Sequence, residues 1–149
     1  MENKNSLTQS LEDYLEAIYH LETKNRVARV KDIAEFLCVQ MPSVTGAVKS
    51  LKKKKLVNYE KNSFISLTER GHTVAKAILR KHTVLQSFLE EVLLLPKNQA
   101  REIACKLEHS IDPEIALRLH NCTRYLTEEV FEKTLDPAEW RAKIIQSIS

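Results

Sequence analysis

The pattern of apolar and polar residues predicts helices from the start of the chain. Apolar residues at helical spacing indicate a first helix over residues 8–24. Thr8 or Ser10 can cap its start, and Asn25 ends it. A second helical pattern, VKDIAEFL, covers Val30–Leu37. The chain therefore opens with two amphipathic helices, each with one apolar face for a shared core.

A tight turn, a third helix and a hairpin come next. Residues 38–40 form the turn, and Pro42 suits the first turn of a helix because its missing N–H needs no partner there. This helix ends in the run Lys52–Lys55. The segments 56–61 and 64–67 carry β-branched and aromatic residues at alternate positions, which predicts a hairpin. This order of elements predicts a winged helix-turn-helix, whose third helix enters the DNA major groove.

Beyond Thr68, a predicted N-cap, the apolar pattern is helical throughout. A long helix continues to Leu95, where Pro96 stops it. Further helical patterns, two of which open with an Asp-Pro pair, cover residues 97–111, 113–126 and 137–148. The predicted fold class is mainly α, with a winged helix-turn-helix domain over residues 1–70 and an all-helical domain over residues 71–149.

The composition is typical of a folded protein that does not enter a membrane. The 149 residues are 43% hydrophobic and 29% charged, with two Gly and four Pro, which excludes collagen-like, low-complexity and disordered classes. No apolar run reaches the ~20 residues that cross a bilayer, and no signal-peptide core follows the first residue. We expect a cytoplasmic protein with three reduced thiols, Cys38, Cys105 and Cys122.

Positive charge is concentrated in the predicted helix-turn-helix and hairpin. Residues 26–62 carry nine Lys or Arg against three acidic residues, whereas residues 1–25 carry two Lys against five. Such a basic cluster neutralises phosphates, so double-stranded DNA is the expected partner. Phosphate contacts dominate the expected affinity because Gly46 offers no side chain for base readout. The expected DNA contacts are Gln40, Pro42, Ser43, Thr45, Lys49, Lys52 and Lys53.

Three potential metal ligands lie at helical spacing late in the chain. Cys105, Glu108 and His109 stand at positions i, i+3 and i+4, which places a thiol, a carboxylate and an imidazole on one side of a helix. Such a set suits Fe(II), Co(II), Ni(II) or Zn(II), and also Mn(II) if further carboxylates complete it. The simpler interpretation is an ordinary helix with a solvated Glu-His pair and a small apolar Cys.

Titratable residues in two other regions have similarly simple interpretations. Asp13 and Glu16 lie one turn apart on the first helix, where a solvated acidic face is the simplest interpretation. His82 follows Arg80 and Lys81 in the long helix. Considered alone, His82 is expected to face solvent, although it can also turn inward.

Together these residues resemble the metal-dependent repressors related to the diphtheria toxin repressor and the manganese transport regulator. SLEDYLEAIYHL (residues 10–21) is similar to the family's opening helix, VKDIAEFLCVQMPSVTGAVKSL to its helix-turn-helix, and YEKNSFISLTERG to its wing. RKHTVLQSFL (residues 80–89) is similar to its connecting helix, and ACKLEHSID (residues 104–112) to its metal-binding helix. The resemblance covers residues 7–126 and implies a transcriptional regulator, not an enzyme, of the short form without an SH3-like domain.

The resemblance also implies a ligand set. The primary metal site would consist of Asp13, Cys105, Glu108 and His109. A second site would add Glu16 and His82, so that each subunit binds one or two ions. The iron-sensing branch typically has Met in place of Asp13, and the manganese-sensing branch has a carboxylate in place of Cys105. The expected ion is therefore Mn(II) or Fe(II), and the predominance of oxygen ligands favours Mn(II).

The implied protein is a homodimer whose second domain binds metal and dimerises. It would bind operator DNA and repress metal-uptake genes. Metal need not touch DNA, because it can act by binding the DNA-competent arrangement more tightly. The two recognition helices would contact two half-sites of the operator. These half-sites would be separated by about one helical turn of DNA or a small multiple of it.

Two other functions explain parts of the sequence. A winged-helix transcription factor that responds to a redox signal or a small organic ligand explains residues 30–67 but leaves the six potential ligands as coincidence. A helical carboxylate metalloenzyme needs paired Glu-x-x-His motifs, and the chain has that spacing once, at Glu69 and His72. A DNA affinity that does not change with Mn(II) or Fe(II) would indicate the winged-helix factor without metal. Oxygen-dependent turnover would indicate the metalloenzyme.

Overall fold

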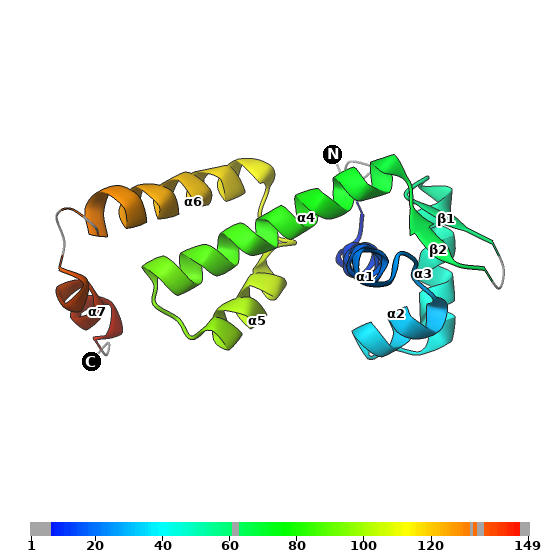
Figure 1. Cartoon of the computed structure of the whole chain (residues 1–149), viewed down its shortest axis with the longest axis horizontal. Helices are drawn as coiled ribbons and strands as arrows, with labels where there is room; N and C mark the ends of the chain where they lie inside the picture. The colour runs from blue at the N-terminus through cyan, green and yellow to red at the C-terminus, as the bar shows by residue number, and fades with distance from the viewer. Residues whose placement is uncertain (1–6, 61–62, 132, 134–135, 147–149) are drawn as a thin grey trace. The chain divides into compact units, whose positions relative to one another are not determined.

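The computed structural model describes residues 7–60, 63–131, 133 and 136–146 (Figure 1). The chain forms two compact units, Met1–Leu79 and Arg80–Ser149, whose boundary falls inside helix α4 (Glu69–Ser87). The boundary predicted after residue 70 lies at the start of this helix and stays a prediction. The mainly α class is confirmed, since the sheet in the described residues has two short strands. No helix among these residues is long and apolar enough to cross a membrane.

The first unit opens with three helices at the predicted positions. They are α1 (Gln9–Asn25), α2 (Val30–Leu37) and α3 (Met41–Lys53). The Oγ1 atom of Thr8 caps α1 by accepting a hydrogen bond from the N–H of Leu11 at 3.3 Å. After α2, Cys38 adopts a left-handed conformation with φ 56°. This residue produces the tight turn of the helix-turn-helix, which is confirmed.

The apolar faces of these helices share one core with the hairpin and the first half of α4. Its fully buried side chains include Leu15, Ile18, Ile33, Val44, Val48, Leu51 and Ile65. Burying one such side chain contributes about 1.5–3 kcal/mol. Because every element of the first unit contributes to this core, α3 and the hairpin are packed together.

The hairpin is shorter than predicted. Strand β1 (Val57–Tyr59) pairs with antiparallel β2 (Ile65–Leu67) through the pairs Val57–Leu67, Asn58–Ser66 and Tyr59–Ile65. The predicted first strand extended to Lys61, which lies outside the described residues. Ile65 also exchanges two backbone hydrogen bonds, of 2.8 and 3.1 Å, with Ala28. This bridge attaches the hairpin to the segment between α1 and α2.

The long helix after the hairpin starts where the sequence predicts but ends earlier. Thr68 caps it, because its Oγ1 atom accepts a hydrogen bond from the N–H of Gly71 at 3.0 Å. α-Helical geometry ends at Ser87, and the π-helical turn η1 (Phe88–Val92) follows. Leu94 then has a left-handed conformation with φ 57°. The prediction of one uninterrupted helix is wrong here, because apolar spacing does not reveal where i→i+5 bonding replaces i→i+4 bonding.

The described part of the second unit is helical. After η1 come α5 (Lys97–Leu107), α6 (Pro113–Tyr125), the π-helical segment η2 (Leu126–Phe131) and α7 (Pro137–Ile145). Asp112 and Asp136 cap α6 and α7 as predicted, each with a 2.9 Å hydrogen bond to a backbone N–H. Helix α5 ends at Leu107, whereas the sequence predicted its end at Ile111. The segment η2 was not predicted. The buried core of this unit contains Leu85, Leu89, Ala100 and Ala104.

Candidate metal centre and nucleic-acid interface

Glu108 places a carboxylate in the interior of the second unit. The residue follows α5 with helical backbone angles (φ −57°, ψ −31°), and its N–H donates to the carbonyl of Ala104 at 2.9 Å. Residues i and i+4 share one helix face, so Glu108 points to the same side as the buried Ala104. The Glu108 side chain is 0% exposed. Removing a carboxylate from water costs several kcal/mol unless charged or hydrogen-bonding groups face it.

Two imidazoles face this carboxylate. The Nδ1 atom of His82, in α4, lies 2.6 Å from Oε2 of Glu108, and Nε2 of His109 lies 3.5 Å from Oε1. Oε1 makes no hydrogen bond to any described residue. Carboxylate oxygen and imidazole nitrogen are common ligands of divalent transition metals. The donor atoms of these three residues are therefore of the types that a transition-metal site uses.

The inward position of His82 corrects the expectation that it faces solvent. Its side chain is 15% exposed. The neighbouring Lys81 donates from Nζ to the carbonyl of Ile111 at 3.4 Å, which ties α4 to the segment after α5. The same packing brings His82 against Glu108. Helical spacing alone could not reveal this contact, because the partner lies 26 positions away.

The other predicted ligands are Cys105, Asp13 and Glu16, beside the trio of His82, Glu108 and His109. Cys105 is an exposed residue of α5. Asp13 and Glu16 are half-buried residues of α1, in the first unit. Among the described residues, no three His, Cys, Asp or Glu side chains are arranged so that they could hold a metal ion. The complete ligand set thus stays a prediction, of which the structure brings together His82, Glu108 and His109.

The exposed side of α3 carries the predicted DNA contacts. Its other side packs into the core through Val44, Ala47, Val48 and Leu51. Gly46 lies on the exposed side, where an added Cβ would meet nothing within 4 Å. Thr45 is half-buried, and the remaining predicted contacts are exposed: Gln40, Pro42, Ser43, Lys49, Lys52 and Lys53. The helix therefore presents an open and basic surface.

Lys52 also has a partner within the protein. Its Nζ atom donates to the carbonyl of Tyr59 at 2.6 Å, which connects the end of α3 to β1. Lys52 and Lys53 were both predicted to contact DNA. In the structure, Lys52 additionally supports the hairpin.

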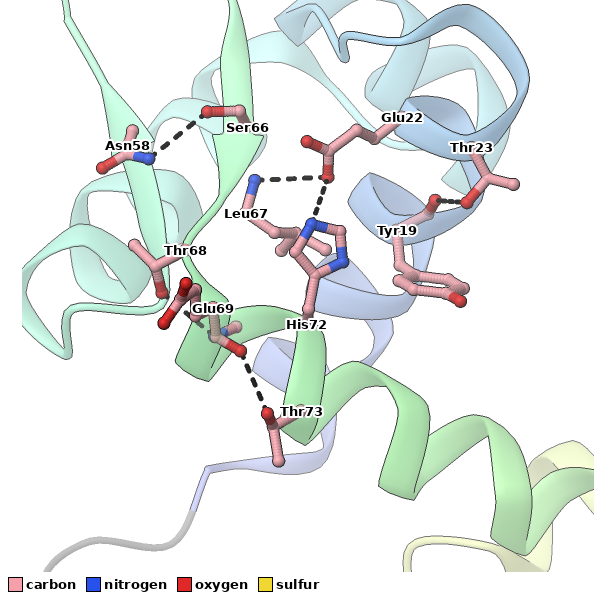
Figure 2. Close-up of polar contacts among 11 residues, drawn as sticks. Tyr19, Glu22, Thr23, Asn58, Ser66, Leu67, Thr68, Glu69, His72 and Thr73 are labelled. Atoms are coloured by element: carbon pink, nitrogen blue, oxygen red, sulfur yellow. Dashed lines mark hydrogen bonds and ion pairs between the residues drawn. The ribbon is translucent and has the colours of Figure 1, made fainter.

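Glu22, which the sequence did not single out, connects three elements of the first unit. Figure 2 shows its Oε2 atom accepting a hydrogen bond from the N–H of Leu67 in β2 at 3.3 Å. The same oxygen lies 3.5 Å from Nε2 of His72 in α4. Glu22 belongs to α1, which also carries two predicted metal ligands. No local sequence signal marks it, because Leu67 is 45 positions away.

Two family models match the chain in succession. Residues 6–64 match the N-terminal DNA binding domain of iron dependent repressors, and residues 68–133 match their metal binding and dimerisation domain. The uncharacterized HTH-type transcriptional regulator MJ0568 of Methanocaldococcus jannaschii is 43% identical over 114 residues, which are 76% of this chain and 91% of that protein. The HTH-type transcriptional regulator MntR of Geobacillus kaustophilus is 34% identical over 122 residues, which are 82% of this chain and 86% of MntR.

A solved structure supports the same relationship. The manganese regulator SloR is 33% identical with a TM-score of 0.69, and the match covers 80% of this chain and 55% of SloR. The chain thus spans about half the length of that solved protein. Two consecutive domains of one family match residues 6–64 and 68–133, which contain the sequence motifs. The chain therefore belongs to the family of metal-dependent, DNA-binding transcriptional regulators that includes the diphtheria toxin repressor and the manganese transport regulators, and it is not an enzyme.

Proposed function

We propose that this protein is a repressor that senses Mn(II) or Fe(II), binds operator DNA as a homodimer and controls metal-uptake genes in the cytoplasm. The buried carboxylate of Glu108 between His82 and His109 supports the metal role most directly. The exposed basic side of α3 supports the operator role, together with the match of residues 6–64 to a DNA binding domain. The match of residues 68–133 to a dimerisation domain supports the homodimer.

Six residues would hold the ions. The primary site would use Asp13, Cys105, Glu108 and His109, and a second site would add Glu16 and His82. A bound ion supplies positive charge that compensates the carboxylates. The 2.6 Å contact between His82 and Glu108 holds both side chains in a defined orientation. Such preorganisation reduces the ordering cost of binding and holds the ligands in a defined geometry.

Asp13 and Glu16 belong to the DNA-binding unit, and the other four proposed ligands belong to the second unit. Ligands from both units would make metal affinity depend on the DNA-competent arrangement. By linkage, DNA affinity would then depend equally on metal. Glu22 holds α1 to β2 and α4, so a constraint on α1 also acts on the hairpin. A coupling of ~1–3 kcal/mol corresponds to a roughly 5- to 150-fold change in affinity.

Manganese is the ion that the proposed ligand set favours. Three of its six side chains are carboxylates, which are hard ligands suited to Mn(II). The relative SloR is described as a manganese regulator. Cys105 is the soft ligand that would instead favour Fe(II), and the matching family models are named for iron. Replacing Cys105 with Asp should therefore strengthen the preference for Mn(II) over Fe(II).

Anaerobic titration of metal-free protein with Mn(II) and Fe(II) tests the proposal. Calorimetry measures the ions bound per subunit, and fluorescence anisotropy of labelled duplex DNA measures DNA affinity in the same samples. We expect one or two ions per subunit and tighter DNA binding when they are bound. Glu108→Gln keeps the shape of the side chain but removes its charge, and it should weaken metal binding at least about tenfold.

Glu114→Ala is the matched control, because Glu114 is an exposed partner of Arg118 on α6. This variant should bind metal like the wild type. A wild-type protein that binds neither ion, and binds DNA equally well in a chelator, would contradict the proposal. That result would favour a winged-helix regulator that responds to a redox signal or an organic ligand.

A further inference from the structure

A hollow of about 670 Å³ lies in the first unit between the start of α3 and the hairpin. The residues that matter for its chemistry are Arg29, Met41, Pro42, Tyr59 and Phe64. Met41 is 53% exposed and Phe64 is 51% exposed. The hollow is continuous with the exposed side of α3, because Pro42 and Thr45 of that helix line it. It thus extends the proposed DNA-binding surface toward the hairpin.

Arg29 is held over this hollow by the hairpin. Its neighbour Ala28 pairs with Ile65 through backbone hydrogen bonds of 2.8 and 3.1 Å. This bridge brings Arg29 beside Phe64, and the Arg29 guanidinium carbon lies 5.0 Å from the centre of the Phe64 ring. A guanidinium stacked on an aromatic ring keeps its N–H edge available for a phosphate. No ion pair among the described residues includes Arg29.

The hollow combines one fixed cation with exposed apolar side chains. Deoxyribose and thymine methyl groups contact apolar side chains, while phosphates bind Arg. A strand of duplex DNA offers both kinds of group in alternation. We propose that one strand of the operator enters this hollow, an inference that rests on the proposed function. A phosphate would bind Arg29, and the sugar and base edges would contact Met41 and Phe64. Arg29 is then a DNA contact, and Phe64 is the residue that positions it.

The salt dependence of DNA binding tests this contact. The probe is a fluorescein-labelled duplex that wild-type protein with Mn(II) selects from a randomised oligonucleotide pool. Arg29→Ala should weaken binding roughly tenfold and reduce the slope of log K against log salt by about 0.9. The order of preference among duplex sequences should stay unchanged, because a phosphate contact carries no sequence information. Arg29→Lys should keep the slope and lose part of the affinity, since Lys retains the charge without the planar stack.

Lys31→Ala is the matched control, because Lys31 is an exposed cation of α2 that pairs with Glu35 at 3.7 Å and does not line the hollow. It should change the slope less than half as much as Arg29→Ala. Phe64→Leu should weaken binding about 2- to 5-fold in the wild type and less in the Arg29→Ala background, because the part of its role that positions the guanidinium is lost there.

Two results would overturn the inference in distinguishable ways. If the wild-type protein binds duplex DNA but Arg29→Ala changes the slope no more than Lys31→Ala, the contact is absent and the proposed function survives. The hollow would then be open to another partner, such as an aromatic small molecule. If the wild-type protein selects no duplex from the pool with or without Mn(II) or Fe(II), the proposed function fails and the inference fails with it.

Discussion

His82 and Glu108 lie 26 positions apart in the sequence, and their side chains meet at 2.6 Å in the interior of the second unit. The contact connects α4 to the end of α5 around a carboxylate with no exposed surface. A buried acidic group of this kind depends on its partners, because burial removes it from bulk water. The pair is therefore expected to contribute to the stability of the second unit as well as to the proposed metal site.

Removal of one member of this pair should destabilise the second unit. His82→Leu leaves the Glu108 carboxylate without its closest partner, and we expect a loss of about 3 kcal/mol in the free energy of unfolding. Replacing both residues with Leu should cost much less than the sum of the single changes. The measurement is urea unfolding in a chelator, followed by the fluorescence of Trp140, the single Trp of the chain.

Trp140 reports on the correct unit, because its indole N–H donates to the carbonyl of Val92 at 3.0 Å within the second unit. Additive effects of the two single changes would show that the pair does not stabilise the metal-free protein. Arg118→Leu, which removes an exposed partner on α6, should change the free energy of unfolding by no more than about 0.5 kcal/mol.

The two glycines of the chain should respond oppositely to replacement by Ala. Gly46 has open space around it, so Gly46→Ala should stabilise α3 by about 0.5–1 kcal/mol through the lower entropy of the unfolded chain. At Gly71 an added Cβ would lie 2.0 Å from the carbonyl oxygen of Leu56, which already accepts the N–H of Thr68. Gly71→Ala should therefore cost about 2–3 kcal/mol. Urea unfolding followed by circular dichroism measures both, and equal effects would contradict the prediction.

Glu22 should stabilise the attachment of β2 to α1. Glu22→Ala removes the acceptor of the Leu67 N–H and should cost about 1–2 kcal/mol. It should also accelerate hydrogen exchange at the Leu67 amide, whereas Glu22→Gln retains an acceptor oxygen and should keep that amide protected. Glu35→Ala is the control, because Glu35 is an exposed partner of Lys31 and should matter little. Unchanged exchange at Leu67 in Glu22→Ala would refute this role.

Lys52 and Lys53 should differ in their effects despite having equal charges. Each replacement by Ala should reduce the salt slope of DNA binding by about 0.9 if both side chains contact phosphates. Lys52→Ala also removes the 2.6 Å hydrogen bond to the Tyr59 carbonyl and should lower stability by about 1 kcal/mol, unlike Lys53→Ala. Salt-dependent anisotropy and urea unfolding measure the two effects. Identical stability of the two variants would show that the Tyr59 contact is unimportant.

Local signals made the first unit predictable from its sequence. Thr8 and Thr68 accept the hydrogen bonds of N-caps, and Pro42 lies in the first turn of α3. These signals depend on residues within three or four positions of each other, which a single sequence displays directly. The π-helical segments η1 and η2 carry no comparable signal. The sequence therefore predicted one helix to Leu95, whereas α-helical geometry ends at Ser87.

The candidate site was predictable only in part. Glu108 and His109 stood out by their spacing with Cys105, but Cys105 is exposed while Glu108 is fully buried. His82 looked like a solvated residue of a basic run, and the family resemblance alone indicated its inward role. Contacts such as Glu22 with Leu67 and Ala28 with Ile65 depend on the packing of distant segments. Periodicity along the chain does not contain that information.

Operator affinity with and without Mn(II) tests the central claim most directly. Metal-free protein is titrated onto one labelled duplex in a chelator and again with saturating Mn(II), at the same salt concentration, for the wild type and Glu108→Gln. We predict that Mn(II) tightens binding by the wild type roughly 5- to 150-fold and leaves Glu108→Gln almost unchanged. Equal wild-type affinity in the two conditions, with Fe(II) giving the same result, would contradict a metal-dependent regulator.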